Sequence, residues 1–146
     1  MTGSGRHIDR VAYIGTPAIA VEPLIKLNEA GYDIPLVVTG PDKRRGRGSS
    51  TSPSAVKREA ERLGLNVSSD VDDLVSIDVD LAIVVAFGQL ITKHVLDHVQ
   101  MINIHFTLLP RWRGAAPLER AILAGDRKTG VCIMELEETL DTGGIY

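Results

Sequence analysis

The sequence predicts an α/β fold built on a doubly wound, mostly parallel sheet. Two observations predict it. Short apolar stretches alternate along the chain with longer stretches that open at Ser, Thr or Pro and close at Gly, which is typical of strand–helix–strand units. The run LAIVVA at 81–86 is apolar throughout, as expected of a central parallel strand buried on both faces.

The same pattern predicts the individual elements. Strands are expected over 10–15, 34–39, 65–67, 81–86, 101–105 and 130–136. Helices are expected to begin at Thr16-Pro17, Ser52-Pro53, Thr92 and Pro117. These are start signals because a hydroxyl side chain can cap the first turn and proline fits the first helical position. Three helices are expected to end at Gly31, Gly64 and Gly125, and a polar loop is expected over 40–51.

Length and composition are those of one globular domain. No apolar run approaches the ~20 residues that span a bilayer, so no membrane segment is expected. Residues 1–9 lack the apolar stretch of a signal peptide and are expected to be a disordered lead-in. The single cysteine, Cys132, excludes an internal disulfide and is expected to be a small buried strand residue. A cytoplasmic setting is therefore expected.

The charge of the chain bears on its partners. The formal net charge of −3 argues against indiscriminate binding to nucleic acid. Four basic residues nevertheless lie close together, at Lys43, Arg44, Arg45 and Arg47. A basic patch on a mildly acidic chain fits a partner that is contacted at one place. Composition alone also allows a solvated loop that happens to be charged.

Candidate site residues follow three of the expected strands. They are Phe87 with Gly88, His105, and Asp141. Doubly wound sheets bind ligands beyond the carboxyl ends of their strands, so these residues are expected to converge on one edge. The first strand–helix turn, 15–20, lacks the G-x-G-x-x-G pattern, which excludes a nicotinamide or flavin dinucleotide.

Asn103, His105 and Asp141 together suit acyl transfer. Being two residues apart in a strand, Asn103 and His105 point to the same face. An amide can donate to an oxyanion, and an imidazole can donate to it or shuttle a proton. A carboxylate brought near by Gly143 and Gly144 would orient the ring and stabilise its charged form. These residues alone also allow a structural histidine and an ordinary turn aspartate.

The sequence lacks the motif of a nucleophilic residue and the motif of a metal site, which limits the possible reaction mechanisms. No Ser or Cys lies in an elbow motif, which indicates direct transfer rather than a covalent acyl-enzyme. No cluster of Cys, His and carboxylate residues has the spacing of metal ligands, so no metal is expected.

Several motifs carry a resemblance to a known family. NIHFTLLPRWRGAAP at 103–117 resembles the N-x-H-x-S-L-L-P-x-x-R-G-x-x-P signature of formyltransferases that depend on 10-formyltetrahydrofolate, and LDTG at 140–143 is similar to their second signature. The methionyl-tRNA formyltransferases are resembled by GTP at 15–17, AFG at 86–88, RWR at 111–113 and the GRG of the basic loop. The resemblance covers 10–146, with the motifs in the same order and at compatible spacing.

The resemblance implies a Rossmann-like formyltransferase fold and assigns roles to the candidate residues. The catalytic residues would be Asn103, His105 and Asp141. The folate would bind against Phe87, Gly88, Gln89, Leu90, Ile91 and Leu140. Initiator tRNA would be bound by Lys43, Arg44, Arg45 and Arg47. The implied reaction transfers the formyl group of 10-formyltetrahydrofolate to the α-amino group of methionyl initiator tRNA, in translation initiation, by a monomer.

The sequence departs from the family pattern at a few points. Phe106 and Thr107 replace the usual Gly-Ser, and Gly144 stands where aspartate is common. The resemblance also implies that 10–146 is a truncated catalytic domain without the family's C-terminal β-barrel domain. Two alternatives stay open: a formyltransferase of this fold that acts on another amine, and an inactive domain that binds folate or tRNA without turnover.

Overall fold

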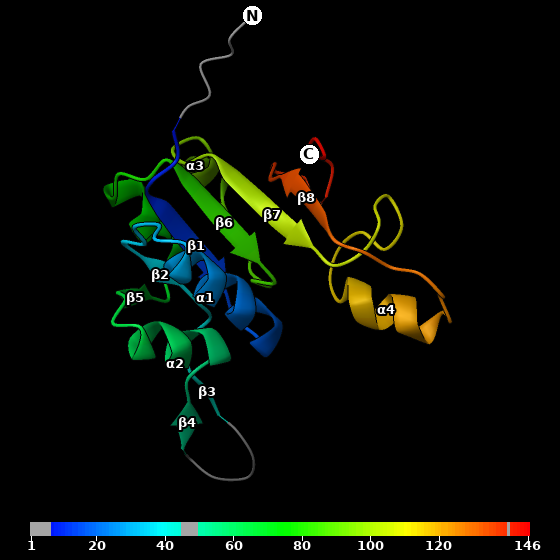
Figure 1. Cartoon of the computed structure of the whole chain (residues 1–146), viewed down its shortest axis with the longest axis horizontal. Helices are drawn as coiled ribbons and strands as arrows, with labels where there is room; N and C mark the ends of the chain where they lie inside the picture. The colour runs from blue at the N-terminus through cyan, green and yellow to red at the C-terminus, as the bar shows by residue number, and fades with distance from the viewer. Residues whose placement is uncertain (1–6, 45–49, 140) are drawn as a thin grey trace, which may run out of the picture.

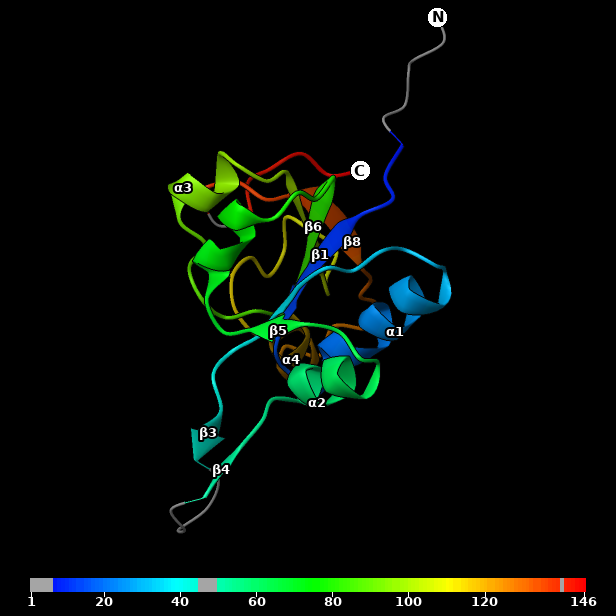
Figure 2. The same ribbon diagram turned by 90° about the vertical axis from the view of Figure 1, so that its left-hand side faces the viewer.

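The computed structural model describes residues 7–44, 50–139 and 141–146, and within them it forms a mostly parallel sheet with helices on both faces (Figures 1 and 2). The main sheet has the order β5-β2-β1-β6-β7-β8. Its strands are β1 (Val11–Gly15), β2 (Val37–Val38), β5 (Val67–Ser68), β6 (Leu81–Val85), β7 (Met101–His105) and β8 (Cys132–Glu135). The mostly parallel, doubly wound sheet expected from the sequence is confirmed.

The helical elements cover the sheet unevenly. They are α1 (Val21–Glu29), α2 (Ala55–Arg62), α3 (Lys93–Leu96), α4 (Pro117–Leu123) and the 3₁₀ turns η1 (Ala18–Ala20) and η2 (Val71–Ser76). Figure 2 shows α1 and α3 on opposite sides of the sheet, whereas α4 lies beyond the strand ends in Figure 1. No helix in the described ranges is long and apolar enough to cross a membrane.

The core consists of two apolar clusters, one on each face of the sheet. One face packs strand residues such as Ile14 and Val84 against Leu74 of η2 and Val95 of α3. The other face has its own set, in which Tyr13 packs with Leu24 of α1 and the α2 residues Val56 and Ala60. All five residues of β6 are buried, as the apolar run at 81–86 predicts.

The last strand runs against the others. β7 pairs in parallel with β6 but antiparallel with β8, in a register that sets His105 opposite Cys132 and Ile102 opposite Glu135. The physical reason lies in the connection: the chain leaves β7 at its carboxyl end and α4 stays at that end, so the next strand re-enters there and must run backwards (Figure 1). This direction changes how Asp141 reaches the site.

The first helix does not begin where its sequence signal predicts. Thr16 caps no helix, because η1 follows Pro17 and α1 begins only at Val21 without a side-chain cap. Instead the Thr16 hydroxyl donates to the Phe87 carbonyl at 3.3 Å and accepts from the Gly40 N–H at 3.1 Å. It therefore ties together the loops after β1, β2 and β6, a tertiary role that outweighs local capping.

The second helix begins two residues later than expected. Ser52 lies in β4, and Ser54 is the cap, accepting from the Lys57 N–H at 2.9 Å. The Ser54 hydroxyl also lies 2.6 Å from the Thr39 hydroxyl, just after β2. The sequence favours Ser52 because Pro53 follows it, whereas the contact with the sheet is made by Ser54.

We expect Ser54→Ala to lower the free energy of unfolding by about 1 kcal/mol, because it removes the cap of α2 together with the Thr39 contact. Ser52→Ala is the matched control and should have a clearly smaller effect. Urea unfolding followed by circular dichroism measures both. Equal losses from the two variants would mean that Ser54 has no special role at the helix start.

The described ends of the polar loop expected over 40–51 form a pair of strands. Lys43–Arg44 forms β3 and pairs antiparallel with β4 (Thr51–Ser52), and the pair projects away from the sheet (Figures 1 and 2). Asp42 at its base forms an ion pair with Lys57 at 2.9 Å. The expectation of a loop is therefore wrong at 43–44 and at Thr51, and the expected cap Ser52 lies in β4 instead. Arg45 and Arg47, like much of the 1–9 lead-in, lie outside the described residues.

The remaining differences concern element length. β2 is shorter than the expected 34–39, β5 begins two residues later than 65, and η2 follows no sequence signal. The three glycines expected to end helices, Gly31, Gly64 and Gly125, all have positive φ. That backbone conformation is one that glycine adopts without strain, so these stop signals are confirmed.

Candidate active site at the carboxyl end of β7

The candidate site is organised around His105, the last residue of β7. Its side chain is almost fully buried, and its ring Nε2 lies 3.0 Å from the Trp112 carbonyl oxygen. A carbonyl can only accept, so Nε2 carries the proton of this hydrogen bond. The ring Nδ1 lies 3.8 Å from Asp141 Oδ1, which is an ion-pair distance rather than a hydrogen bond. A second proton on the ring would therefore face a carboxylate.

Asp141 reaches His105 by a route that the sequence did not predict. Because β8 is antiparallel to β7, the carboxyl end of β8 lies opposite Ile102, not His105. The expectation that Asp141 follows the carboxyl edge of a parallel strand is wrong. The expected proximity arises instead because the chain turns after β8 and Asp141 adopts a left-handed conformation, with φ of 53°.

The turn that carries Asp141 is fastened on both sides. Asp141 Oδ2 accepts a short hydrogen bond from the Gly114 N–H. After the turn the chain pairs back on β8, where the Gly144 carbonyl accepts from the Glu135 N–H at 2.8 Å. Gly143 passes so close to β8 that a Cβ there would lie 2.0 Å from the Glu135 carbonyl oxygen. The close approach expected of the two glycines is thus required at Gly143 and not at Gly144, which faces open space.

Asn103 lies on the same face of β7 as His105. It is half-buried, and it pairs in register with Val84 of β6 and Met134 of β8. Its neighbours Ile102 and Ile104 join the core on the other face. The Asn103 amide makes no hydrogen bond with any residue that the structure describes, so within those residues it keeps its donor capacity for a ligand.

The segment predicted to contact folate divides into core and surface residues. Phe87 and Ile91 are buried in the core on the α3 side of the sheet. Gly88, Gln89 and Leu90 are exposed, and Leu90 is 77% exposed. Only these three present surface to a ligand in the described part of this segment. Leu140, the remaining folate candidate, lies outside the described residues.

Backbone strain is concentrated around this site. Four non-glycine residues of the described chain have positive φ: Ala86, Trp112, Ala116 and Asp141. Each such residue costs about 1–3 kcal/mol, and residues of this kind cluster at functional sites. Ala86 precedes the folate candidates, and Trp112 and Asp141 supply the groups that face His105. The Trp112 carbonyl and the Gly114 N–H are site groups that the sequence could not reveal, because every residue carries them.

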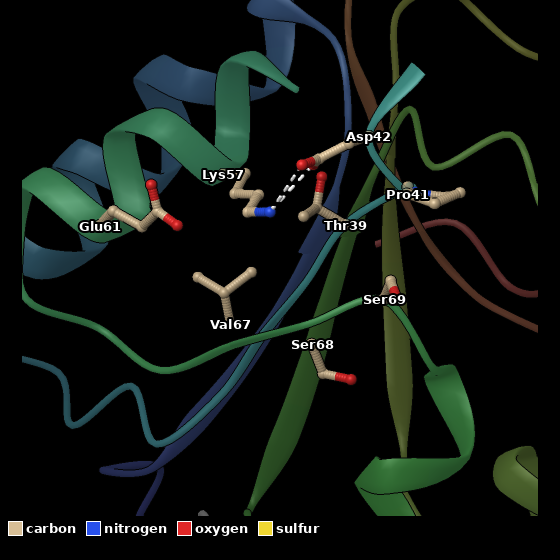
Figure 3. Close-up of a pocket in the computed structure, with 9 residues that line it drawn as sticks. Thr39, Pro41, Asp42, Lys57, Glu61, Val67, Ser68 and Ser69 are labelled. Atoms are coloured by element: carbon tan, nitrogen blue, oxygen red, sulfur yellow. Dashed lines mark hydrogen bonds and ion pairs between the residues drawn. The ribbon is translucent and has the colours of Figure 1, made fainter. Parts of the chain in front are cut away.

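Two hollows on the surface lie away from these residues. One, of about 350 Å³, opens at the carboxyl ends of β2 and β5 beside the β3–β4 pair. Figure 3 shows Lys57, Asp42 and Glu61 on its wall, with Ser68 and Ser69 from the opposite side. The other, of about 310 Å³, is apolar and lies between α1 and the strands β6 to β8. Neither is lined by Asn103, His105 or Asp141.

The described residues include no group of side chains placed to bind a metal ion. Among these residues, no group of three or more His, Cys, Asp or Glu side chains lies close enough to hold an ion.

Fold and site together define a Rossmann-like α/β domain with an amide, an imidazole and a carboxylate near the end of one inner strand. Comparison with known proteins gives the family: the formyl transferase model matches residues 9–146, and the chain belongs to that family.

The sequence relatives are more specific than the family. The chain is 48% identical over 147 residues to the methionyl-tRNA formyltransferase of Synechococcus sp. strain WH7803, covering 93% of this chain and 43% of that protein. It is 46% identical over 143 residues to the methionyl-tRNA formyltransferase of Halorhodospira halophila, covering 92% of this chain and 46% of that protein. The chain thus spans less than half the length of these curated relatives.

Solved structures share the fold at lower identity. The phosphoribosylglycinamide formyltransferase of Bacillus halodurans superposes with a TM-score of 0.72 at 24% identity, over 93% of this chain and 76% of that one. Glycinamide ribonucleotide transformylase 1 of Geobacillus kaustophilus gives 0.74 at 21% identity, over 96% and 80%. At this identity the likeness establishes the fold alone.

Proposed function

We propose that this chain carries the formyl-transfer centre of a methionyl-tRNA formyltransferase. One observation carries the proposal. Buried His105 lies between the Trp112 carbonyl and the Asp141 carboxylate, on the same strand face as Asn103. The donor would be 10-formyltetrahydrofolate and the acceptor the α-amino group of methionine on initiator tRNA. Identity of 48% to one protein of that name, against 24% to a phosphoribosylglycinamide enzyme, favours this acceptor.

Formyl transfer places negative charge on the formyl oxygen, and the site must stabilise that charge. 10-Formyltetrahydrofolate supplies the formyl group, and the methionine nitrogen bonds to its carbon while the carbon–N10 bond breaks. One proton passes from the attacking amine to N10. Negative charge develops on the formyl oxygen. The side-chain amide of Asn103 makes no hydrogen bond to another described residue, so it is free to donate to this oxygen.

His105 and Asp141 would act together in this reaction. The His105 ring can donate to the same oxygen or carry the proton between the two nitrogens. In this structure its Nε2 donates to Trp112, so an oxyanion would compete with that carbonyl for the proton. The Asp141 carboxylate lies 3.8 Å from Nδ1, where it would stabilise positive charge on the ring during proton transfer. No nucleophilic side chain is needed, which fits direct transfer.

The exposed surface after β6 would hold the folate. Gly88, Gln89 and Leu90 lie beyond the carboxyl end of β6, which is the strand next to β7. Ligands of doubly wound sheets bind in this region. Leu90 offers apolar surface, which suits a flat heterocycle. Leu140, beside Asp141 in sequence, remains part of the proposal on the strength of the family resemblance.

The basic residues near 43–47 would bind the acceptor arm of the tRNA. Lys43 and Arg44 are exposed on a pair of strands that projects from the sheet (Figures 1 and 2). Binding through phosphates weakens as salt rises, because each contact releases condensed counterions. Arg45 and Arg47 complete the set by their place in the sequence.

We expect Arg47→Ala to raise KM for tRNA more than Arg44→Ala, because Gly46 and Gly48 let the chain at Arg47 approach nucleic acid closely. The slope of log affinity against log salt should fall by roughly 0.7–0.9 for each phosphate contact removed. KM for the folate should not change in either variant. Equal small effects of the two variants would mean that the loop binds tRNA only as a diffuse positive patch. A change in the folate KM alone would mean that the loop binds folate and not tRNA.

The acceptor can be tested in a hybrid protein. In it, residues 9–146 of this chain replace the matching segment of the Halorhodospira halophila relative, which supplies the remaining length. Labelled 10-formyltetrahydrofolate is offered with methionyl initiator tRNA or with phosphoribosylglycinamide. We expect label only on methionine. Label on phosphoribosylglycinamide would establish the alternative acceptor, and binding of tRNA or folate without label on either would establish the inactive alternative.

A further inference from the structure

Asp126 holds two neighbouring side chains of the segment between β7 and α4. Its carboxylate accepts two hydrogen bonds from Arg111, at 2.9 and 2.8 Å, and one from the Trp112 indole N–H at 2.7 Å. The Arg111 guanidinium also lies 4.5 Å from the centroid of the Trp112 ring. Asp126 is itself anchored, because its N–H donates to the Ala121 carbonyl of α4 at 3.0 Å. The three side chains thus form a closed cluster.

The electrostatics of this cluster favour its charged form. The Arg111 guanidinium, followed by the Trp112 N–H, holds the pKa of Asp126 below its usual range. Paired hydrogen bonds from arginine to a carboxylate have fixed geometry and are among the stronger hydrogen bonds of proteins. The side chain of Asp126 is only 19% exposed, so water competes weakly for its oxygens.

The same two residues fasten the other side of the segment through their carbonyls. The Arg111 carbonyl accepts from the buried Thr107 hydroxyl at 3.1 Å, and the Trp112 carbonyl accepts from His105 Nε2. Trp112 has a φ of 61°, a conformation that a bulky residue adopts only when its surroundings hold it there. The cluster with Asp126 restrains the Trp112 side chain, and the contact with His105 restrains its carbonyl.

We propose that Asp126 is a positioning residue for His105. By holding Arg111 and Trp112, it keeps the Trp112 carbonyl against Nε2, and this contact keeps Nδ1 directed at Asp141. This role of Asp126 rests on the proposed function of the site, but it is observed in the tautomer and orientation of the His105 ring. It can therefore be tested on the 146-residue chain without any measurement of formyl transfer.

The test compares Asp126→Asn with Asp33→Asn. The first substitution keeps the size of the side chain but removes its charge. Asp33→Asn is the matched control, since Asp33 pairs with Arg10 at 2.8 Å beside the amino ends of the strands. The ring nitrogens are observed by NMR in chain labelled with ¹⁵N-histidine, with His105 assigned through His105→Gln. Trp112 is the single tryptophan, so its fluorescence reports on this cluster alone.

We expect the wild-type chain and Asp33→Asn to show His105 protonated at Nε2 in one ring state. In Asp126→Asn, the His105 nitrogen signals should move toward a mixture of tautomers, and Trp112 emission should shift to the red with easier quenching by acrylamide. Unchanged His105 signals beside altered Trp112 emission would overturn the proposal, and so would no change in either. If Asp126→Asn does not fold, Arg111→Gln decides by the same two readouts, because it removes the paired hydrogen bonds and leaves the indole contact.

Discussion

In the Halorhodospira hybrid, His105→Ala is expected to lower kcat for formyl transfer about a hundredfold or more, which is the usual effect of losing one oxyanion donor. KM for 10-formyltetrahydrofolate should change little, because His105 is buried at the end of β7 whereas the exposed folate candidates follow β6. Interactions made mainly in the transition state affect kcat in this way. Asn103→Ala should behave alike, since its amide is proposed to donate to the same oxygen.

His94→Ala is the matched control for this experiment. His94 is an exposed histidine of α3 that lies edge-on to His98. Its loss should leave both kinetic constants close to those of the unaltered hybrid. If His105→Ala kept near-normal kcat, the ring would be removed from the reaction and its contacts with Trp112 and Asp141 would be purely structural.

Gly143→Ala is expected to have the second large effect, because it forces the Asp141 turn away from β8. The added Cβ would lie 2.0 Å from a backbone oxygen of Glu135, and backbone atoms cannot move aside as a flexible side chain can. Overpacking of this kind typically costs about 1–3 kcal/mol of stability. Asp141 would move with the turn, so kcat should fall toward that of Asp141→Ala.

Gly144→Ala is the neighbouring control, because a Cβ at that position meets nothing within 4 Å. Thermal unfolding and hybrid kinetics are measured for both glycine variants. The account requires a clear loss for Gly143→Ala and little change for Gly144→Ala. Similar values for the two would mean that the turn tolerates the added methyl group and does not set the position of Asp141.

The sequence predicts well what depends on local pattern. The apolar run at 81–86 gives β6, the boundaries of β7 agree with the prediction, and Gly31 and Gly64 end helices as expected. Family motifs placed Asn103, His105 and Asp141 in one site, and the structure brings the last two to ion-pair distance.

Contacts between segments that are distant in the sequence could not be predicted from it. Thr16 has the pattern of a helix cap but links three loops, and Ser52 precedes a proline whereas the cap of α2 is Ser54, which contacts Thr39. The direction of β8 depends on where α4 lies, which no periodicity encodes. The partner of His105 Nε2 is the carbonyl of Trp112, a backbone group available at every residue.

If residues of this chain carry out formyl transfer, the hybrid should transfer formyl at a rate close to that of its parent. The hybrid and its parent, the Halorhodospira halophila relative, are compared for the initial rate at which labelled formyl appears on methionyl initiator tRNA. We expect a hybrid rate within about tenfold of the parent rate, equivalent to a difference of no more than ~1.4 kcal/mol in activation free energy. A folded hybrid that binds the tRNA but transfers no more label than its His105→Ala variant would contradict it.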